Sequence, residues 1–175
     1  MNKFKTLSTL CLTLLTLVSC NELDELTEFN VSQNLNATLR VDITEDSGGE
    51  PQSWSDSTTI DISDNAEIQA NLDLIESVMI DSLTFKILNF EGEENAMVTD
   101  ASISFGDTTI DVEDINLNDN TTTYNLGTTA QLNTIANTLK DDSEITIAVS
   151  GTVSSTPVKF DVIISLAVTT TINIL

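Results

Sequence analysis

The sequence contains no histidine among its 175 residues, and this absence excludes several kinds of site. Histidine is the usual general base near neutral pH, a member of the Ser-His-Asp triad and the commonest transition-metal ligand. Catalysis would therefore rest on carboxylates, as in a glycosidase, which needs two facing acids. The acids here are scattered along predicted loops and strand faces, and aromatic residues make up only 5% of the chain. We therefore expect no enzymatic activity.

Basic residues are also scarce, because six lysines and arginines stand against 28 acidic residues and give a net charge of −22. Nucleic acids bind proteins through Lys and Arg contacts to their phosphates, so we expect no nucleic-acid partner. The negative charge instead favours the solubility of an exported protein and attracts divalent cations.

Cysteine is nearly absent, and both copies, Cys11 and Cys20, lie near the N-terminus. Residues 1–5 carry two lysines, and residues 7–18 form an apolar run. A basic start and an apolar run of about 7–15 residues before a small residue are typical of a secretory signal peptide. A transmembrane helix needs about 20 mainly apolar residues, which this segment lacks.

The end of this run, Leu17-Val18-Ser19-Cys20, resembles the lipobox of bacterial lipoproteins, in which signal peptidase cuts before a lipid-modified cysteine. The resemblance implies that residues 1–19 are a cleaved lipoprotein signal peptide and that Cys20 is the lipid attachment site. The alternative is an ordinary cleaved signal with a chance cysteine. Cleavage at this point leaves 28 acidic and four basic residues (6 minus 2), a net charge of −24, and no other thiol.

Residues 20–29 are acidic and are predicted to be a tether, with one helical turn through Leu23 and Leu26 as the alternative. Acidic residues soon after the cysteine resemble the export signal of Bacteroidota lipoproteins. The predicted location is therefore the outer membrane, lipid-anchored, and either periplasmic or surface-exposed. Residues 30–175 are predicted to form a single β-rich domain.

Strict alternation of apolar and polar residues predicts a strand over 35–43, and alternation returns in 145–149. Further strands are predicted over 58–62, 78–90, 97–105, 108–112 and 121–126. Gly106-Asp107 predicts a tight hairpin. The longest alternation follows Pro157 and runs almost to the last residue, which predicts a central strand or one that bridges two sheets.

Two short helices are predicted, each after a capping-box pattern. Asp64 and Glu67 mark the start of a helix over 65–74, and Thr128 and Gln131 mark the start of a helix over 129–140. The predicted fold is mostly β (α+β), an antiparallel β-sandwich or curled sheet. A shift of 64 residues relates the two halves as a possible internal ββαβ repeat, for which convergent patterning is the alternative.

One loop has oxygen-bearing side chains at alternate positions, Asp114, Asn116 and Asn118, which is typical of Ca²⁺ ligands. Its start resembles an EF-hand loop. Asp119 stands where the glycine bend is expected, and Asn125 stands in place of the closing Glu. We predict either a Ca²⁺ site or a solvated loop, and no other cofactor.

Two further residues are candidates for glycan or partner contacts. Trp54, the single tryptophan, either packs in the core or stacks on a partner. Thr108 lies in one of three segments that resemble Bacteroidota O-glycosylation sites, and we expect it to be the most accessible. These segments are Asp56-Ser57-Thr58, Asp81-Ser82-Leu83 and Asp107-Thr108-Thr109.

The sequence therefore predicts a non-catalytic, lipid-anchored envelope protein that binds another envelope protein or an extracellular polymer. A carrier in which the sheet curls around a small hydrophobic ligand is the second hypothesis. The two differ in whether the apolar sheet faces meet in a filled core or leave a lined cavity. A calcium-binding surface module is the third.

Overall fold

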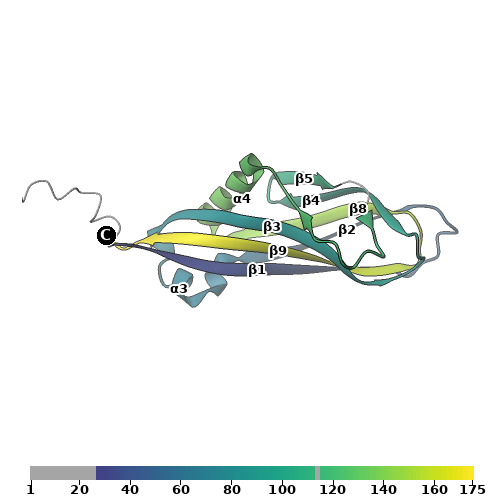
Figure 1. The fold of residues 1–175 in the computed structure, drawn as a ribbon, viewed down its shortest axis with the longest axis horizontal. Coiled ribbons are helices and arrows are strands. Elements are labelled where there is room, and N and C mark those ends of the chain that lie inside the picture. Colours follow the sequence, from purple (N-terminus) through teal and green to yellow (C-terminus); the bar gives the residue numbers. More distant parts are fainter. Residues whose placement is uncertain (1–26, 113–114) are drawn as a thin grey trace, which may run out of the picture.

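A computed structural model describes residues 27–112 and 115–175 of the protein. The chain forms an elongated sandwich of two antiparallel sheets (Figure 1). Within these residues, none of the helices has the length and apolar character needed to cross a bilayer. The prediction of a mostly β sandwich with two helical segments is confirmed.

The first sheet has the strand order β1-β9-β3-β7. Its strands are β1 (Glu28–Ile43), β9 (Val158–Asn173), β3 (Ile75–Glu91) and β7 (Tyr124–Asn125). The long C-terminal strand β9 pairs along its whole length with β1 and along most of it with β3, so it is central as predicted. Every second residue of β9 is buried, which explains its long alternating pattern.

The second sheet has the order β2-β8-β4-β5, and a short strand β6 also pairs with β4. Its strands are β2 (Gln52–Asp61), β8 (Glu144–Val153), β4 (Met97–Phe105), β5 (Thr108–Val112) and β6 (Ile115–Asn116). The predicted hairpin is confirmed, because Phe105 pairs with Thr108 across a two-residue turn in which Gly106 has a φ of +54°. The inner faces of the two sheets form one hydrophobic core.

The second predicted helix is confirmed as α4 (Thr129–Asp142), and its capping box between Thr128 and Gln131 is present. The helix covers one side of the sandwich (Figure 1), where its contacts are mainly with β3. Ile135 and Leu139 of its apolar stripe are fully buried, whereas Leu132 is half-buried.

The first predicted helix, over 65–74, is wrong in its length and cap. The segment contains only one turn, α3 (Ala66–Gln69), between two 3₁₀ turns, η2 (Ile62–Asp64) and η3 (Leu72–Leu74). Asn65, not Asp64, is the N-cap, since its side chain accepts hydrogen bonds from two backbone amides. The Asn71 side chain donates to the Glu67 carbonyl, and such local bonds compete with helix propagation.

The predicted strand over 121–126 is also too long, because only Tyr124 and Asn125 pair with β3. Thr121 and Thr122 instead hydrogen-bond to the carboxylate of Asp119. This local turn takes the backbone away from the sheet until Tyr124, whose ring stacks on Phe85 with 4.7 Å between ring centroids.

The chain crosses between the two sheets in each of its halves. From β2 in the second sheet the chain passes through helical turns to β3 in the first, and from β7 it passes through α4 to β8 in the opposite direction. In addition, β2 pairs with β8 and β3 pairs with β7. This reciprocity is compatible with the predicted ββαβ repeat, which itself stays a prediction.

Candidate functional site

The lipobox residues Leu17 to Cys20 lie outside the described residues, so their predicted role stays a prediction. Strand β1 begins at Glu28, two residues before the predicted start of the domain at residue 30. The end of the predicted tether therefore belongs to the sheet. The amide of Ile174 donates to the carbonyl of Thr27 at 3.0 Å, which brings the chain entry beside the C-terminus (Figure 1).

Trp54 lies against the core rather than on an open face. Its ring meets Phe160 edge-on, with 5.5 Å between the ring centroids. Its indole N–H is buried and has no hydrogen-bond partner in the structure. The ring thus packs against the core while the side chain stays partly buried, and its contact with a glycan or partner stays a prediction.

The inner faces of the two sheets pack closely beside Trp54. The apolar gap beside Trp54 has a volume of about 10 Å³. A cavity needs about that volume to hold one water molecule, so this gap has no room for a hydrophobic ligand. The side chains that line it come from both sheets and include Phe85, Ile103 and Phe160.

The loop predicted to bind Ca²⁺ is held by its own hydrogen bonds. Asp114 lies outside the described residues. The side-chain oxygen of Asn116 accepts a hydrogen bond from the amide of Asn118 at 3.0 Å, and Asn116 itself pairs with Met97, the first residue of β4. Among residues 27–112 and 115–175 no group of three acidic or thiol side chains is placed to hold a metal.

Asp119 follows in this loop and is the centre of a hydrogen-bonded turn. Its carboxylate accepts bonds from the hydroxyl of Thr122 and from the amide and hydroxyl of Thr121. These bonds, that of the Thr122 hydroxyl first, lower the pKa of Asp119 to about 2. A carboxylate stabilised in this way closes its own loop.

Thr108 was predicted to be the most accessible of the three candidate glycosylation residues, and this is wrong. It is the first residue of β5 and is half-buried, whereas Ser57 and Ser82 are exposed. The reason is the two-residue turn, which is so tight that Thr108 already pairs with Phe105.

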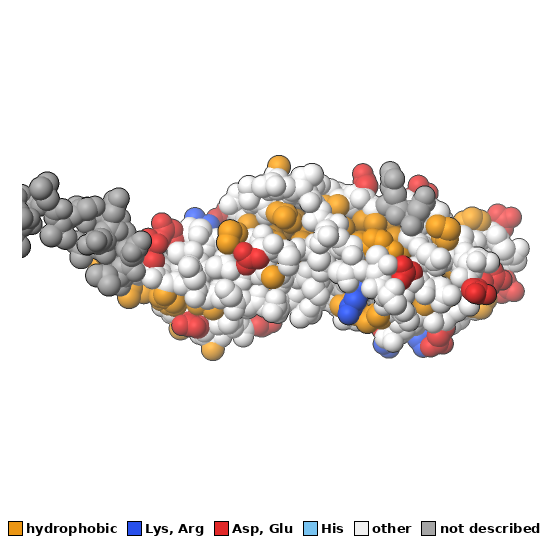
Figure 2. All heavy atoms as spheres, viewed as in Figure 1, with side chains coloured by type: hydrophobic (Ala, Val, Ile, Leu, Met, Phe, Trp, Pro, Cys, Tyr) orange, Lys and Arg blue, Asp and Glu red, His pale blue; other side chains and the backbone are white. Residues whose placement is uncertain are grey.

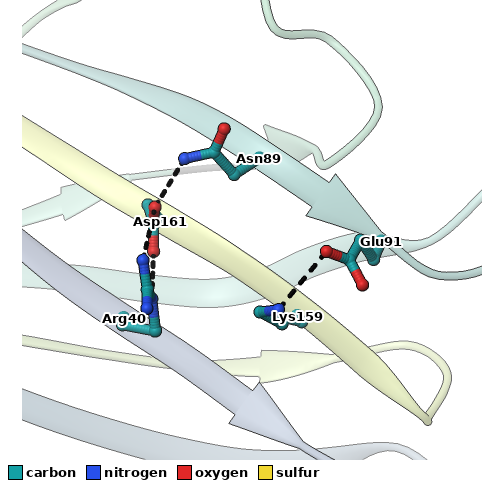
Figure 3. Close-up of polar contacts among 5 residues, drawn as sticks. All are labelled: Arg40, Asn89, Glu91, Lys159 and Asp161. Atoms are coloured by element: carbon teal, nitrogen blue, oxygen red, sulfur yellow. Dashed lines mark hydrogen bonds and ion pairs between the residues drawn. The ribbon is translucent and has the colours of Figure 1, made fainter.

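A polar cluster that the sequence did not predict lies on the outer face of the first sheet (Figure 3). The Arg40 guanidinium donates to both carboxylate oxygens of Asp161, at 2.9 and 3.4 Å. Asn89 donates its side-chain amide to the same carboxylate at 2.7 Å. The three residues come from β1, β9 and β3, so the cluster connects three neighbouring strands.

The chemistry of this cluster is that of an ion pair rather than of an acid catalyst. Hydrogen bonds from Arg40 and Asn89 lower the pKa of Asp161, so its carboxylate stays ionised. Asn89 has a φ of +54° beside a register shift between β3 and β9, which directs its amide toward Asp161. Arg40 is 65% exposed, and three of its five N–H groups have no described protein partner.

Two more cations lie on the same face. Lys159 forms an ion pair with Glu91 at 3.3 Å (Figure 3), and Lys86 pairs across the sheet with Ile163, one row from Asp161. Lys86 takes part in neither of the two ion pairs of the described residues. We call the surface around Arg40, Lys86 and Lys159 the cation face.

An open groove of about 310 Å³ adjoins the cation face. It lies at the end of β1, β3 and β9 and is lined by Asp42, Ile43, Thr44, Glu91, Gly92, Pro157, Val158 and Lys159. The sequence does not indicate that these cations lie close together. Arg40 and Lys159 are 119 residues apart and come together only through the pairing of β1 with β9.

No protein-family model matches the sequence, and no curated protein matches it either. A similar solved structure is that of a decameric BFDV capsid protein, with 8% sequence identity and a TM-score of 0.41. The alignment covers 82% of this chain and 98% of that one. A likeness this low carries no argument about function.

Proposed function

We propose that the protein is a lipid-anchored envelope lipoprotein, attached through Cys20, and that it is a non-catalytic binding or accessory module. The single observation that carries the binding role is the convergence of Arg40, Lys86 and Lys159 on one face. After cleavage before Cys20 these are three of four basic residues in a chain of net charge −24. A chain with so few cations presents them together on the cation face.

The partner is proposed to offer carboxylate groups. The exposed Arg40 has a planar fork of donors that suits a carboxylate, and Lys86 supplies a charge with no ion-pair partner among the described residues. The partner is either another envelope protein or an extracellular polymer with acidic groups. The site of action is the outer membrane, on its periplasmic or outer surface.

The other two hypotheses have less support. The gap of about 10 Å³ between the sheets gives no support to a carrier of hydrophobic ligands. The side-chain oxygens of Asn116 and Asp119 are occupied by their own loop, which gives no support to a Ca²⁺ site.

The test is a mild-detergent pull-down of the full-length lipidated protein with charge-reversed variants. Lys86→Glu is expected to reduce recovery of a stoichiometric partner, because it reverses the one charge of the cation face that has no ion-pair partner among the described residues. Lys140→Glu is the matched control, since Lys140 is exposed on α4 and away from that face. Equal recovery with both variants, or no stoichiometric partner at all, contradicts the proposed binding role.

A further inference from the structure

The large hydrophobic side chains that are exposed among the described residues belong to segments at one end of the sandwich, the left end in Figure 2. We call this set the apolar tip. It comprises Leu72 (38% exposed), Leu74 (40%), Met79 (55%), Ile174 (56%) and Leu175 (87%). Soluble domains carry scattered exposed hydrophobics, but a group confined to one end indicates a contact surface.

Three different parts of the chain form this tip. Leu72 and Leu74 belong to η3, which leads directly into Ile75, the first residue of β3. Ile75 pairs with Ile172, and the chain ends three residues later. Met79 lies opposite Thr169, about 13 Å further along the strand. The tip is therefore the end at which β3 begins and β9 finishes.

The same end receives the chain from the predicted lipid site. Glu28 pairs with Asn173, and the carbonyl of Thr27 accepts the amide of Ile174. Seven residue steps separate Cys20 from Thr27, and an extended chain gains at most about 3.6 Å per step. The tether therefore spans at most about 25 Å, whereas the 16 residues of β9 span about 53 Å. A lipid at Cys20 consequently keeps the tip, and not the opposite end, close to the bilayer.

We propose that the apolar tip lies against the lipid surface to which Cys20 anchors the protein, an inference that rests on the proposed lipid anchor. The short tether holds the tip at high local concentration over the bilayer, so a modest apolar contact is sufficient for docking. Asp73 and Glu76 are exposed between and beside the tip residues, so the favoured surface is zwitterionic rather than anionic. Docking in this way directs the long axis of the sandwich away from the membrane.

The experiment uses single-cysteine variants, because the lipidated mature chain has no other thiol. Leu74→Cys and Leu175→Cys place a thiol-reactive fluorophore at the tip, and Leu175→Cys alters only the exposed last residue. Glu50→Cys places it in the exposed loop between β1 and β2, at the opposite end (Figure 1). Each lipidated protein is reconstituted into phosphatidylcholine vesicles that contain a lipid-borne quencher.

We expect at least threefold stronger quenching at both tip positions than at Glu50→Cys, and no strengthening when anionic lipid is added. Equal quenching at all three positions, in protein that floats with the vesicles, overturns the docked tip alone. Quenching at the tip positions that changes on dilution of the protein within the bilayer indicates a second copy as the occupant and also overturns it. Failure of the protein to float overturns the lipid anchor and this inference together.

Discussion

Gly151 of β8 faces Trp54 of β2 across the second sheet, and the absence of a side chain at residue 151 makes room for the indole. A Cβ atom at this position lies 2.8 Å from Val98 Cγ1 and 3.5 Å from both Ala101 Cα and Trp54 Nε1. Strand β4 is shifted in register opposite Gly151, between Thr99 and Ser102. Gly151 therefore lets the shifted strand and the indole approach the same point of the core.

Gly151→Ala is expected to lower the free energy of unfolding by about 1–3 kcal/mol, because the added methyl group overpacks the core against Val98. Urea denaturation measures the change. Ala148→Ser, on the exposed face of the same strand, is the control and is expected to change stability by less than about 0.5 kcal/mol. An unchanged midpoint for Gly151→Ala contradicts the close packing described here.

Thr170→Val is expected to stabilise the protein. The Thr170 hydroxyl is fully buried in β9, between Val31 and Val78, and has no hydrogen-bond partner. Valine has a similar shape, and removing an unpartnered buried hydroxyl is expected to raise the free energy of unfolding by about 1–2 kcal/mol. A loss of stability in thermal or urea unfolding shows that the hydroxyl does find a partner.

The two ion pairs of the cation face are expected to differ in their contribution to stability. The Asp161 side chain is 5% exposed and that of Glu91 is 71% exposed. Asp161→Ala removes a charged acceptor that binds both Arg40 and Asn89, so we expect a loss of about 1–3 kcal/mol. Glu91→Ala is the matched variant, and its loss is expected to stay below about 1 kcal/mol. Similar losses for both variants are the contradictory result.

Asp119 is expected to give the protein a measurable sensitivity to acid. Its pKa of about 2 in the folded protein lies below the usual value near 3.9 for an unfolded chain. Its stabilising contribution is therefore present above about pH 4 and is lost as the pH falls toward 2. NMR titration of the carboxyl group checks the value, and Thr122→Val is expected to raise it. A midpoint near 4 in the wild type argues against the hydrogen-bonded turn.

Alternation of apolar and polar residues predicts the sandwich well where strands are long. Strand β9 illustrates this, because both of its neighbours and the inward-facing core impose the same two-residue period. Local signals also place α4, whose capping box between Thr128 and Gln131 forms as the sequence indicates.

The helix predicted over 65–74 shows where such signals are insufficient. Ile68, Leu72 and Ile75 have helical spacing, but only Ile68 is buried as part of a helix. Ile75 instead starts β3 opposite Ile172, and this long-range pairing ends the helical segment. Periodicity alone does not indicate which residues will pair with a strand that is distant in the sequence.

Local sequence patterns do not indicate the cation face either. Arg40 and Asp161 are both visible in the sequence, but their contact depends on the pairing of the first and last strands. Asn89 reaches the same carboxylate from a position with positive φ at a register shift, which no local pattern indicates. Predicting the cation face thus requires knowledge of the strand order, whereas predicting the lipid site requires only residues 17–20.

The proposed membrane attachment depends on Cys20, and metabolic labelling with palmitate tests it directly. Wild-type protein is expected to incorporate label and to fractionate with membranes, whereas Cys20→Ala is expected to incorporate none. Detection of both proteins by immunoblot confirms that each is expressed. Equal labelling of the two proteins, or an unlabelled wild type, contradicts the proposal that this sandwich is anchored by a lipid at Cys20.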